Sequence, residues 1–461
     1  MFRPSRFMNV MLFLAVLSLG SVSLFGGKFL PNPLKTSDSS GVLATYSTAG
    51  GIDINNPFFQ ELGTNGRTCN TCHISTSAWG LTPADVQQKF KATNGMDPIF
   101  RSNDGSNCPS ADVSTVDARQ RAFSQLLNKA LIRVSVAAPE TAHFQIVDIQ
   151  DPYNCPETTV SNPALYRRPL PAANLKFLSA IMWDGRETIF GAIPGKSLNL
   201  TQSLTNQAID ATAGHAQGAI QPTPEQLSQI VAFETSLYSA QVNDQHAGSL
   251  TEEATGGPEN LSGQTSFVGI NDALGGDPTG AAFNPNVFTL YTKWANSHSP
   301  YRQSVAQGED LFNNLPIPIT GVGGLNDALG QPVIMGTCTA CHDAPNAGNH
   351  SFSVPLAIGT TAYPAMPALD IAGLPVYTIR CQDTGATVRV TDPGRALISG
   401  KCADIGKVKG PVLRALAARG PYFHNGAAAT LEAAVEFYNQ RFNLNLTPQQ
   451  KTDLVAFLKT L

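Results

Sequence analysis

The sequence contains two copies of the pattern C-x-x-C-H, one at Cys69, Cys72 and His73 and one at Cys338, Cys341 and His342. At this spacing two thiols add covalently to a haem, and the adjoining imidazole binds its iron. With eight Cys and eight His in 461 residues, chance predicts only about 0.002 copies. A zinc site would need two further ligands near each pair. We therefore predict two covalent haem c groups, with His73 and His342 as iron ligands.

The chain begins with a basic stretch from Met1 to Arg6, followed by an apolar run from about Val10 to Phe25. This order is typical of an export signal. No A-x-A cleavage site follows, and the run is nearly long enough to span a bilayer, so an uncleaved N-terminal membrane anchor stays an alternative. We expect a periplasmic protein that is either soluble or tethered by this segment.

About 430 residues follow the signal, which is enough for two domains. Forty Gly and 32 Pro indicate a loop-rich chain wrapped around cofactors. We predict a mainly α fold with two cytochrome-c-like domains, each carrying one covalent haem c. The expected segments are a signal or anchor at 1–30, a linker at 31–50, an N-terminal haem domain at 51–245, a connecting segment at 246–300 and a C-terminal haem domain at 301–461.

Four cysteines remain outside the haem motifs, namely Cys108, Cys155, Cys381 and Cys402. In an oxidising compartment they are expected to form two disulfides, for which sequence alone permits three connectivities. We predict Cys108–Cys155 and Cys381–Cys402, because each pair then lies within one expected domain.

Local patterns predict several elements. Threonine followed by proline is a helix N-terminus signal, and apolar residues at helical spacing follow it. The expected elements are a helix from Thr82, a helix from Val116 to about Leu131, a strand over Phe144–Ile149, a helix from Thr223 that includes Tyr238 and a last helix from Thr447 to Leu461.

Three further stretches accompany the haem motifs: Met182-Trp-Asp-Gly-Arg186, Gly410-Pro-Val-Leu-Arg414 and Gly420-Pro-Tyr-Phe-His-Asn-Gly426. Together they resemble the bacterial di-haem cytochrome c peroxidase family, which includes the MauG-type enzymes. Their order and spacing agree from about Asn65 to the C-terminus. The resemblance implies that the N-terminal haem reacts with peroxide and that the C-terminal haem relays electrons to it. It also places Trp183 between the two haems.

In that family an axial ligand of the second haem lies 14 residues after the histidine that is His424 here. This position is Tyr438, whereas many of the peroxidases have Met, and Tyr is similar to the MauG type. A phenolate donor stabilises ferric iron. Met366 and Met335 are alternative donors, and simple packing of Tyr438 on an apolar helix face is a further reading. We interpret His424 as a hydrogen-bonding residue beside the site.

The first haem's surroundings depart from the family. Lys89 stands where peroxidases often carry a His. Gln207 matches the family's distal Gln, but Gln217 replaces the catalytic Glu ten residues later, and an amide cannot shuttle a proton. His215 is able to do so, since its unperturbed pKa lies near the working range. It is also a candidate iron ligand or a surface histidine, and all three roles stay open.

The resemblance implies hydrogen peroxide as the substrate and a small cytochrome c or cupredoxin as the electron donor. The alternatives are MauG-like oxidation of a partner protein or small molecule, and a non-catalytic electron-transfer di-haem cytochrome. A net charge of −4 gives no basic footprint for nucleic acid. Arg168 replaces the Asn expected at the family's calcium site, so calcium is not firmly predicted. A homodimer is left open.

Overall fold

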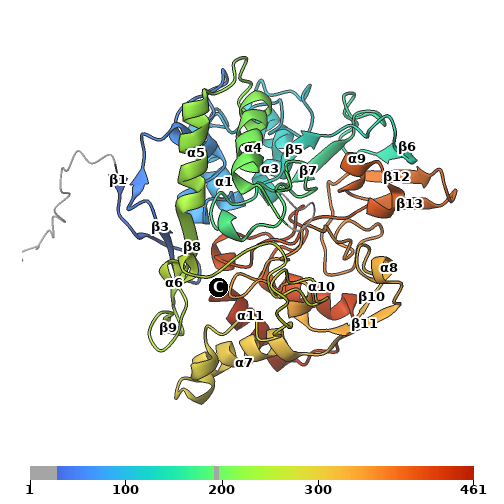
Figure 1. The fold of residues 1–461 in the computed structure, drawn as a ribbon. Helices are drawn as coiled ribbons and strands as arrows, with labels where there is room; N and C mark the ends of the chain where they lie inside the picture. The colour runs from blue at the N-terminus through green and yellow to red at the C-terminus, as the bar shows by residue number, and fades with distance from the viewer. Residues whose placement is uncertain (1–28, 192–196) are drawn as a thin grey trace, which may run out of the picture.

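The computed structural model describes residues 29–191 and 197–461 (Figure 1). The predicted export signal or anchor lies almost wholly outside them. The described helices are α1 (Pro83–Thr93), α2 (Val116–Ala122), α3 (Ser124–Lys129), α4 (Leu200–Gly214), α5 (Pro224–Ser236), α6 (Pro258–Ser262), α7 (Pro300–Asn314), α8 (Asn326–Leu329), α9 (Ala396–Ser399), α10 (Leu431–Arg441) and α11 (Pro448–Lys459). The described strands are β1 (Phe29–Leu30), β2 (Leu34–Ser37), β3 (Gly41–Ser47), β4 (Ile52–Asp53), β5 (Ile132–Ser135), β6 (Phe144–Gln150), β7 (Ala164–Arg167), β8 (Leu237–Asp244), β9 (Gly248–Ser249), β10 (Ile317–Thr320), β11 (Val333–Gly336), β12 (Val376–Cys381) and β13 (Thr387–Val390).

Helices α1, α5 and α11 begin where threonine and proline predicted them. The Thr82 side chain accepts a hydrogen bond from the Asp85 backbone N–H, and Thr447 accepts one from Gln450. Each threonine thus satisfies a backbone donor that the first helical turn leaves unpaired. These helix starts are confirmed, as is the predicted strand at β6.

Two helix predictions were wrong in extent. The helix expected from Val116 to Leu131 is broken at Phe123 into α2 and α3. Helix α5 ends at Ser236, so Tyr238 lies in β8 and not on the helix. Strand β8 pairs with β3, and this long-range pairing outweighs the local helical spacing of the apolar residues.

The predicted linker at 31–50 is also wrong, because this segment forms β2 and β3. Strand β3 is the partner of both β2 and β8 in a four-stranded sheet of order β2-β3-β8-β9. Leu43 and Ala44 are buried in it. The Ser and Thr content suggested a tether, but the partner strand that orders this segment lies almost 200 residues later.

The loop-rich character of the fold is confirmed, since long irregular segments separate short helices and strands (Figure 1). The strand content is higher than the predicted mainly α fold implies. The described residues contain five small sheets of two to four strands. Their short lengths give too little period-two alternation for recognition in the sequence.

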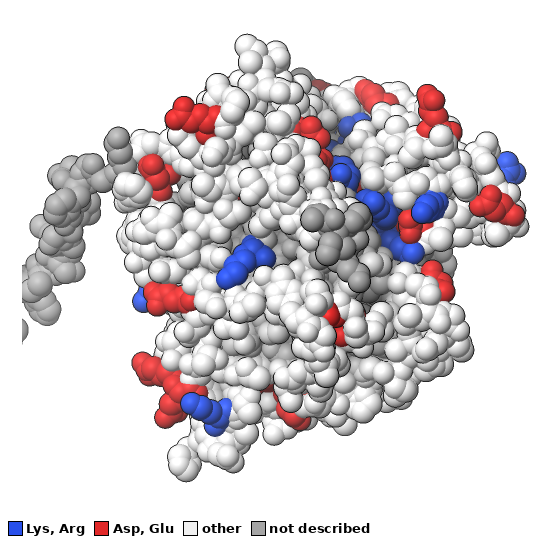
Figure 2. Space-filling model, viewed as in Figure 1, with Lys and Arg blue, Asp and Glu red and all other residues white. Residues whose placement is uncertain are grey.

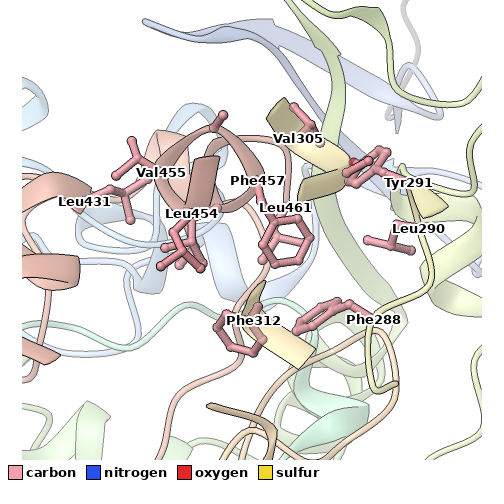
Figure 3. Packing of buried hydrophobic residues seen from close by; sticks show 14 of the residues in the cluster. Phe288, Leu290, Tyr291, Val305, Phe312, Leu431, Leu454, Val455, Phe457 and Leu461 are labelled. Atoms are coloured by element: carbon pink, nitrogen blue, oxygen red, sulfur yellow. The ribbon is translucent and has the colours of Figure 1, made fainter. Parts of the chain in front are cut away.

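A large apolar core lies where α7, α10 and α11 meet (Figure 3). Phe288 packs edge to face on Phe312 and Phe457, and the rings of Phe312 and Phe457 are tilted against each other, with all three pairs of ring centroids 5.3–5.8 Å apart. Helices α7 and α11 approach closely at Gly308, where an added Cβ would lie only 2.0 Å from the Asp453 carbonyl oxygen. Glycine at this position therefore sets how near the two helices can lie.

A separate core surrounds the first motif, with Phe58, Trp79 and Phe233 at its centre. Segments from the two predicted domains also share structure. Strand β6, from the N-terminal part, pairs with β12, so that β13, β12 and β6 form one sheet (Figure 1). The predicted domain boundaries stay predictions.

Charged side chains of both signs are sparse on the face shown in Figure 2. Within residues 29–191 and 197–461, the structure has no helix long and apolar enough to cross a bilayer.

Candidate haem sites

The two C-x-x-C-H motifs share one backbone geometry. Each begins with a short 3-10 helix, Cys69–Thr71 in the first motif and Cys338–Ala340 in the second. In each, the histidine N–H donates to the carbonyl of the first cysteine, at 3.0 Å for His73 and 3.1 Å for His342. The repeated sequence pattern therefore produces a repeated local structure.

Each motif histidine is oriented in the same way. His73 Nδ1 lies 3.1 Å from the Trp79 carbonyl oxygen, and His342 Nδ1 lies 2.7 Å from that of Gly348, six residues on in both cases. Bonding to a carbonyl makes Nδ1 the protonated nitrogen, as in metal-binding histidines whose other nitrogen is the ligand. Burial lowers the pKa of both imidazoles. The hydrogen bond to a carbonyl thus fixes the orientation of each imidazole, in a form that suits the predicted iron ligation by His73 and His342.

The four motif cysteines are free thiols, whereas Cys108–Cys155 and Cys381–Cys402 are disulfides. The predicted disulfide connectivity is confirmed. Burial raises the pKa of the motif thiols, to about 11 for Cys72 and about 12 for the other three.

Zinc is disfavoured at both motifs. A zinc site places four ligand atoms around one point. Among the described residues, one group of three Cys, His, Asp or Glu side chains has this closeness, namely Cys108, Cys155 and Glu157. Its two cysteines are joined in a disulfide. The donor set at each haem motif, two thiols and one preset imidazole, fits haem c.

The second motif opens into a cavity of about 240 Å³ whose lining is predominantly apolar. A single water needs about 10–15 Å³ by the same measure, so this space suits a large ligand. His342 and Tyr438 both line it, together with Cys338 and Cys341. The attachment thiols, the predicted proximal ligand and the predicted opposite ligand thus share one cavity.

The alternative donors for the second haem lie elsewhere. Neither Met335 nor Met366 is among the cavity-lining residues, and Met335 is 67% exposed. Tyr438 is half-buried beside Phe423 and Phe437. Burial raises the pKa of its phenol, with smaller contributions from Cys341 and Cys338. An unligated Tyr438 is therefore a neutral phenol.

Trp183 and His424 lie side by side on the wall of the same cavity, with ring centroids 6.2 Å apart. Trp183 Nε1 donates to the Arg168 carbonyl at 2.8 Å. His424 is buried, and neither ring nitrogen has a hydrogen-bond partner among the described residues. Burial outweighs the nearby Asp392 and lowers the pKa of His424 to about 4. This histidine is neutral at physiological pH.

Leu170 connects this wall to the first motif. It lines the large cavity, and its backbone also interacts with the His73 imidazole. Arg168, two residues earlier, donates to the carbonyls of Leu81, Lys129 and Arg419. The segment carrying Arg168 and Leu170 thus lies between the two motifs.

Polar side chains surround the first motif. His215 Nδ1 lies 2.5 Å from Asp104 Oδ2, and Arg67 Nη1 lies 2.5 Å from Asp104 Oδ1. Arg67 also donates to the His215 carbonyl at 3.0 Å. Burial alone would raise the pKa of Asp104, but the hydrogen bond from His215 and the charge of Arg67 lower it overall. An ionised Asp104 therefore holds His215 by Nδ1 and leaves Nε2 available.

The loop carrying His215 and Gln217 packs against the segment that leads into the first motif. Asn65 Nδ2 donates to the His215 carbonyl at 2.9 Å and lies 3.2 Å from Gln217 Oε1. An added Cβ at Gly63 would lie 2.0 Å from the Ala216 carbonyl oxygen, so glycine permits this contact. Gln207 is half-buried in α4, about two turns before His215.

No protein-family model matches the sequence. Cytochrome-c peroxidase IdrP1 of Denitromonas iodatirespirans is 33% identical over 139 residues, which is 27% of this chain and 36% of the relative. Cytochrome c551 peroxidase of Nitrosomonas europaea is 44% identical over 69 residues, 15% of this chain and 21% of the relative. Over about a quarter of its length, this chain is similar to bacterial cytochrome c peroxidases. The matches span about a third or less of these peroxidases.

A second peroxidase of Denitromonas iodatirespirans, IdrP2, is 33% identical over 140 residues, with 27% of this chain and 36% of the relative covered. The solved structure of a MauG-like protein associated with microbial copper homeostasis aligns with 94% of this chain and 93% of its own, at a TM-score of 0.42 and 15% identity. The resemblance to cytochrome c peroxidases that the motifs indicated is thus confirmed by the peroxidase relatives.

Sequence reasoning missed Asp104 and Arg67 beside His215. Arg67 carried a weak signal, since it lies two residues before Cys69. Asp104 carried none, because 111 residues separate it from His215. Sequence reasoning also missed the buried cation Lys409, which lies one residue before the Gly410–Arg414 stretch.

Proposed function

We propose that this chain is an exported di-haem c oxidoreductase that reduces hydrogen peroxide at the N-terminal haem, with electrons relayed by the C-terminal haem. The observation that carries the proposal is one motif geometry in two different surroundings. The first motif has an ion-paired histidine beside it, and the second has an apolar cavity with a tyrosine. The peroxidase relatives support this division between a reacting site and a relay site.

At the second site, Cys338 and Cys341 would hold the haem and His342 would bind its iron. Tyr438 would supply the opposite axial ligand, since it lines the same cavity as His342. An anionic oxygen donor lowers the reduction potential of haem iron. The surrounding apolar walls would keep water away from this centre.

At the first site, Cys69 and Cys72 would hold the haem and His73 would bind its iron. When bound, the iron supplies a coordination position for peroxide and the electrons that reduce it. His215 would move the protons. Because Nδ1 faces the ionised Asp104, Nε2 is the ring nitrogen that remains to exchange a proton. Nε2 would take a proton from one peroxide oxygen and return it to the other.

The two glutamines would serve as hydrogen-bonding neighbours of the first site. Gln217 is exposed and bonds Asn65 through its side chain, and an amide does not transfer protons at neutral pH. Gln207 would line the approach along α4. Proton transfer is therefore assigned to His215 alone.

Trp183 would lie on the electron path between the haems. Its indole is bonded to Arg168, and Leu170, two residues on, reaches both the large cavity and His73. Electrons would enter at the second haem from a small cytochrome c or cupredoxin in the periplasm. The two formed disulfides suit an oxidising compartment.

A second candidate function is electron transfer without peroxide chemistry. A carboxylate bonded to Nδ1 is also the arrangement found behind metal-ligating histidines. If Nε2 of His215 binds the iron of the first haem, that iron has no position left for peroxide. MauG-like oxidation of a partner protein is a variant of the main proposal, favoured by the tyrosine at position 438.

The deciding experiment is electron paramagnetic resonance of the ferric protein with and without peroxide, after a pyridine haemochrome assay. The proposal expects two haems per chain, with one high-spin signal that peroxide removes. Fewer than two haems would contradict the assignment of the motifs. Two low-spin signals that do not respond to peroxide would favour the electron-transfer cytochrome.

A further inference from the structure

A second, smaller cavity adjoins the large one and is lined by three cations. Its volume is about 30 Å³, enough for two or three waters or one carboxylate group. Lys409, Arg414 and Arg419 line it, and none of its lining residues is Asp or Glu. Lys409 and Arg419 also line the large cavity, together with Leu170. The two spaces therefore meet at these cations.

The three cations are poorly compensated by the protein. Lys409 is 6% exposed, and its ammonium has no ion-pair or hydrogen-bond partner in the part of the chain that the structure describes. Arg414 is 1% exposed, and its Nε and Nη2 also lack partners there. Among the residues that the structure describes, the Arg419 side chain donates to the carbonyls of Ala415 and Val412. Buried charge without a counter-charge is costly, so this cluster of cations favours an anionic ligand.

The pKa directions agree with this reading. Burial, with a smaller contribution from the charge of the nearby Arg419, lowers the pKa of Lys409 to about 7. Burial likewise lowers the pKa of Arg414 to about 10. An anion between these groups would reverse the direction at Lys409 by favouring its charged form.

We propose that the small cavity binds one carboxylate side arm of the second haem, with Lys409 as its principal partner. A haem carries two propionates, and a haem attached at the second motif would occupy the large cavity that this cation cluster borders. The inference rests on haem attachment at Cys338 and Cys341, which is part of the proposed function, but it does not depend on peroxide chemistry.

The site also touches the path between the motifs. The Lys409 backbone N–H donates to the Trp183 carbonyl at 2.8 Å. Ala78 and Leu170, from the first motif's side, complete the small cavity. A propionate held by Lys409 would thus lie beside the segment assigned to electron transfer between the haems.

The test compares Lys409→Gln with Lys409→Arg and with the control Lys407→Gln in the full-length haem protein. Lys407 is also buried, but it is ion-paired with Asp404 at 3.0 Å and lines neither cavity. We would measure haem content and the reduction potential of the second haem between pH 5 and 9.

We expect two haems in all three variants. Lys409→Gln removes a positive charge near the iron, so the reduction equilibrium of the second haem should shift at least tenfold toward ferric, which is 59 mV for one electron. Its potential should also fall more steeply as the pH rises, since the propionate can now be protonated. Lys409→Arg should restore the wild-type behaviour, and Lys407→Gln should not change it.

An unchanged potential in Lys409→Gln, or an equal change in Lys407→Gln, would overturn the proposal. A wild-type potential that depends on added chloride or phosphate would show that a free anion fills the cavity, which also overturns it. A wild-type protein that contains fewer than two haems per chain would instead contradict the proposed function.

Redox-difference infrared spectroscopy of the wild-type protein keeps the inference testable if Lys409→Gln does not fold. The proposal expects ionised carboxylate bands that respond to reduction of the second haem throughout pH 6–9. A protonated carboxyl band that responds to this reduction at pH 7 would overturn it.

Discussion

The two haem motifs have the same local structure but opposite surroundings. Beside the first lies a chain of polar groups, Arg67, Asp104 and His215, and the His215 side chain is 43% exposed. The second opens into an apolar cavity with Tyr438 on its wall. The comparison teaches that C-x-x-C-H determines attachment, while residues contributed from distant segments determine whether a site can handle protons and solvent.

The largest expected effect comes from removing attachment at one motif at a time. Cys338→Ala with Cys341→Ala should reduce the haem content from two per chain to one, and Cys69→Ala with Cys72→Ala should do the same. Each pair supplies the two thiols that bond one haem. The pyridine haemochrome assay measures the haem content. An unchanged haem content in either double variant would show that the substituted motif does not attach a haem.

The next effect tests the proton function of the first site. His215→Ala should slow the reaction with peroxide by about 100-fold or more, because acid–base catalysis typically contributes about 10²–10⁴-fold. The resting spectrum should stay the same. Stopped-flow absorbance measures the rate, and His143→Ala, an exposed histidine in the same half, is the control. A faster reaction with a new high-spin signal would identify His215 as an iron ligand.

Asp104→Asn should slow the peroxide reaction by about tenfold, since partners behind a functional histidine typically contribute 10–100-fold. The exposed Asp112→Asn serves as the control. A tenfold lower rate with a normal haem content would show that Asp104 positions His215 and is not needed only for folding. An unchanged rate would show that Asp104 is only structural.

The same variant tests a pH dependence. The pKa of Asp104 is lowered from its ordinary value of 3.8. Its ion pairs therefore stabilise the fold fully above that value, and this contribution is lost as the pH falls through the lower, folded-state pKa. Urea unfolding should show the wild type to be more stable than Asp104→Asn at pH 7, with the difference shrinking below pH 4. A constant difference would contradict this.

The smallest effect on peroxide chemistry is expected at the second site. Tyr438→Phe keeps the aromatic packing and removes the oxygen donor, so the peroxide rate at the first haem should change less than about twofold, and the free energy of unfolding by less than about 1 kcal/mol. The spectrum of the second haem should change and its potential should rise. Tyr422→Phe, which loses a bond to the Leu416 carbonyl, is the control. An unchanged spectrum would move the donor to Met366.

The sequence by itself determined the features that depend on short range. The haem motifs and the threonine-capped helices depend on residues whose spacing is local enough to read. The disulfide pairing was chosen from three connectivities by assigning each pair to one expected domain, and the structure confirms it. The family resemblance that the Gly420–Gly426 stretch carries also indicated that Tyr438 shares the second cavity with His342.

Only the tertiary structure decided the features that need distant partners. Residues 34–47 form strands because β8 supplies hydrogen bonds from the other end of the N-terminal half. Asp104 meets His215 across 111 residues, and Lys409 loses its solvent because segments from both halves close over it. Hydrogen-bond pairing and desolvation depend on three-dimensional neighbours, and spacing along a chain does not specify those neighbours.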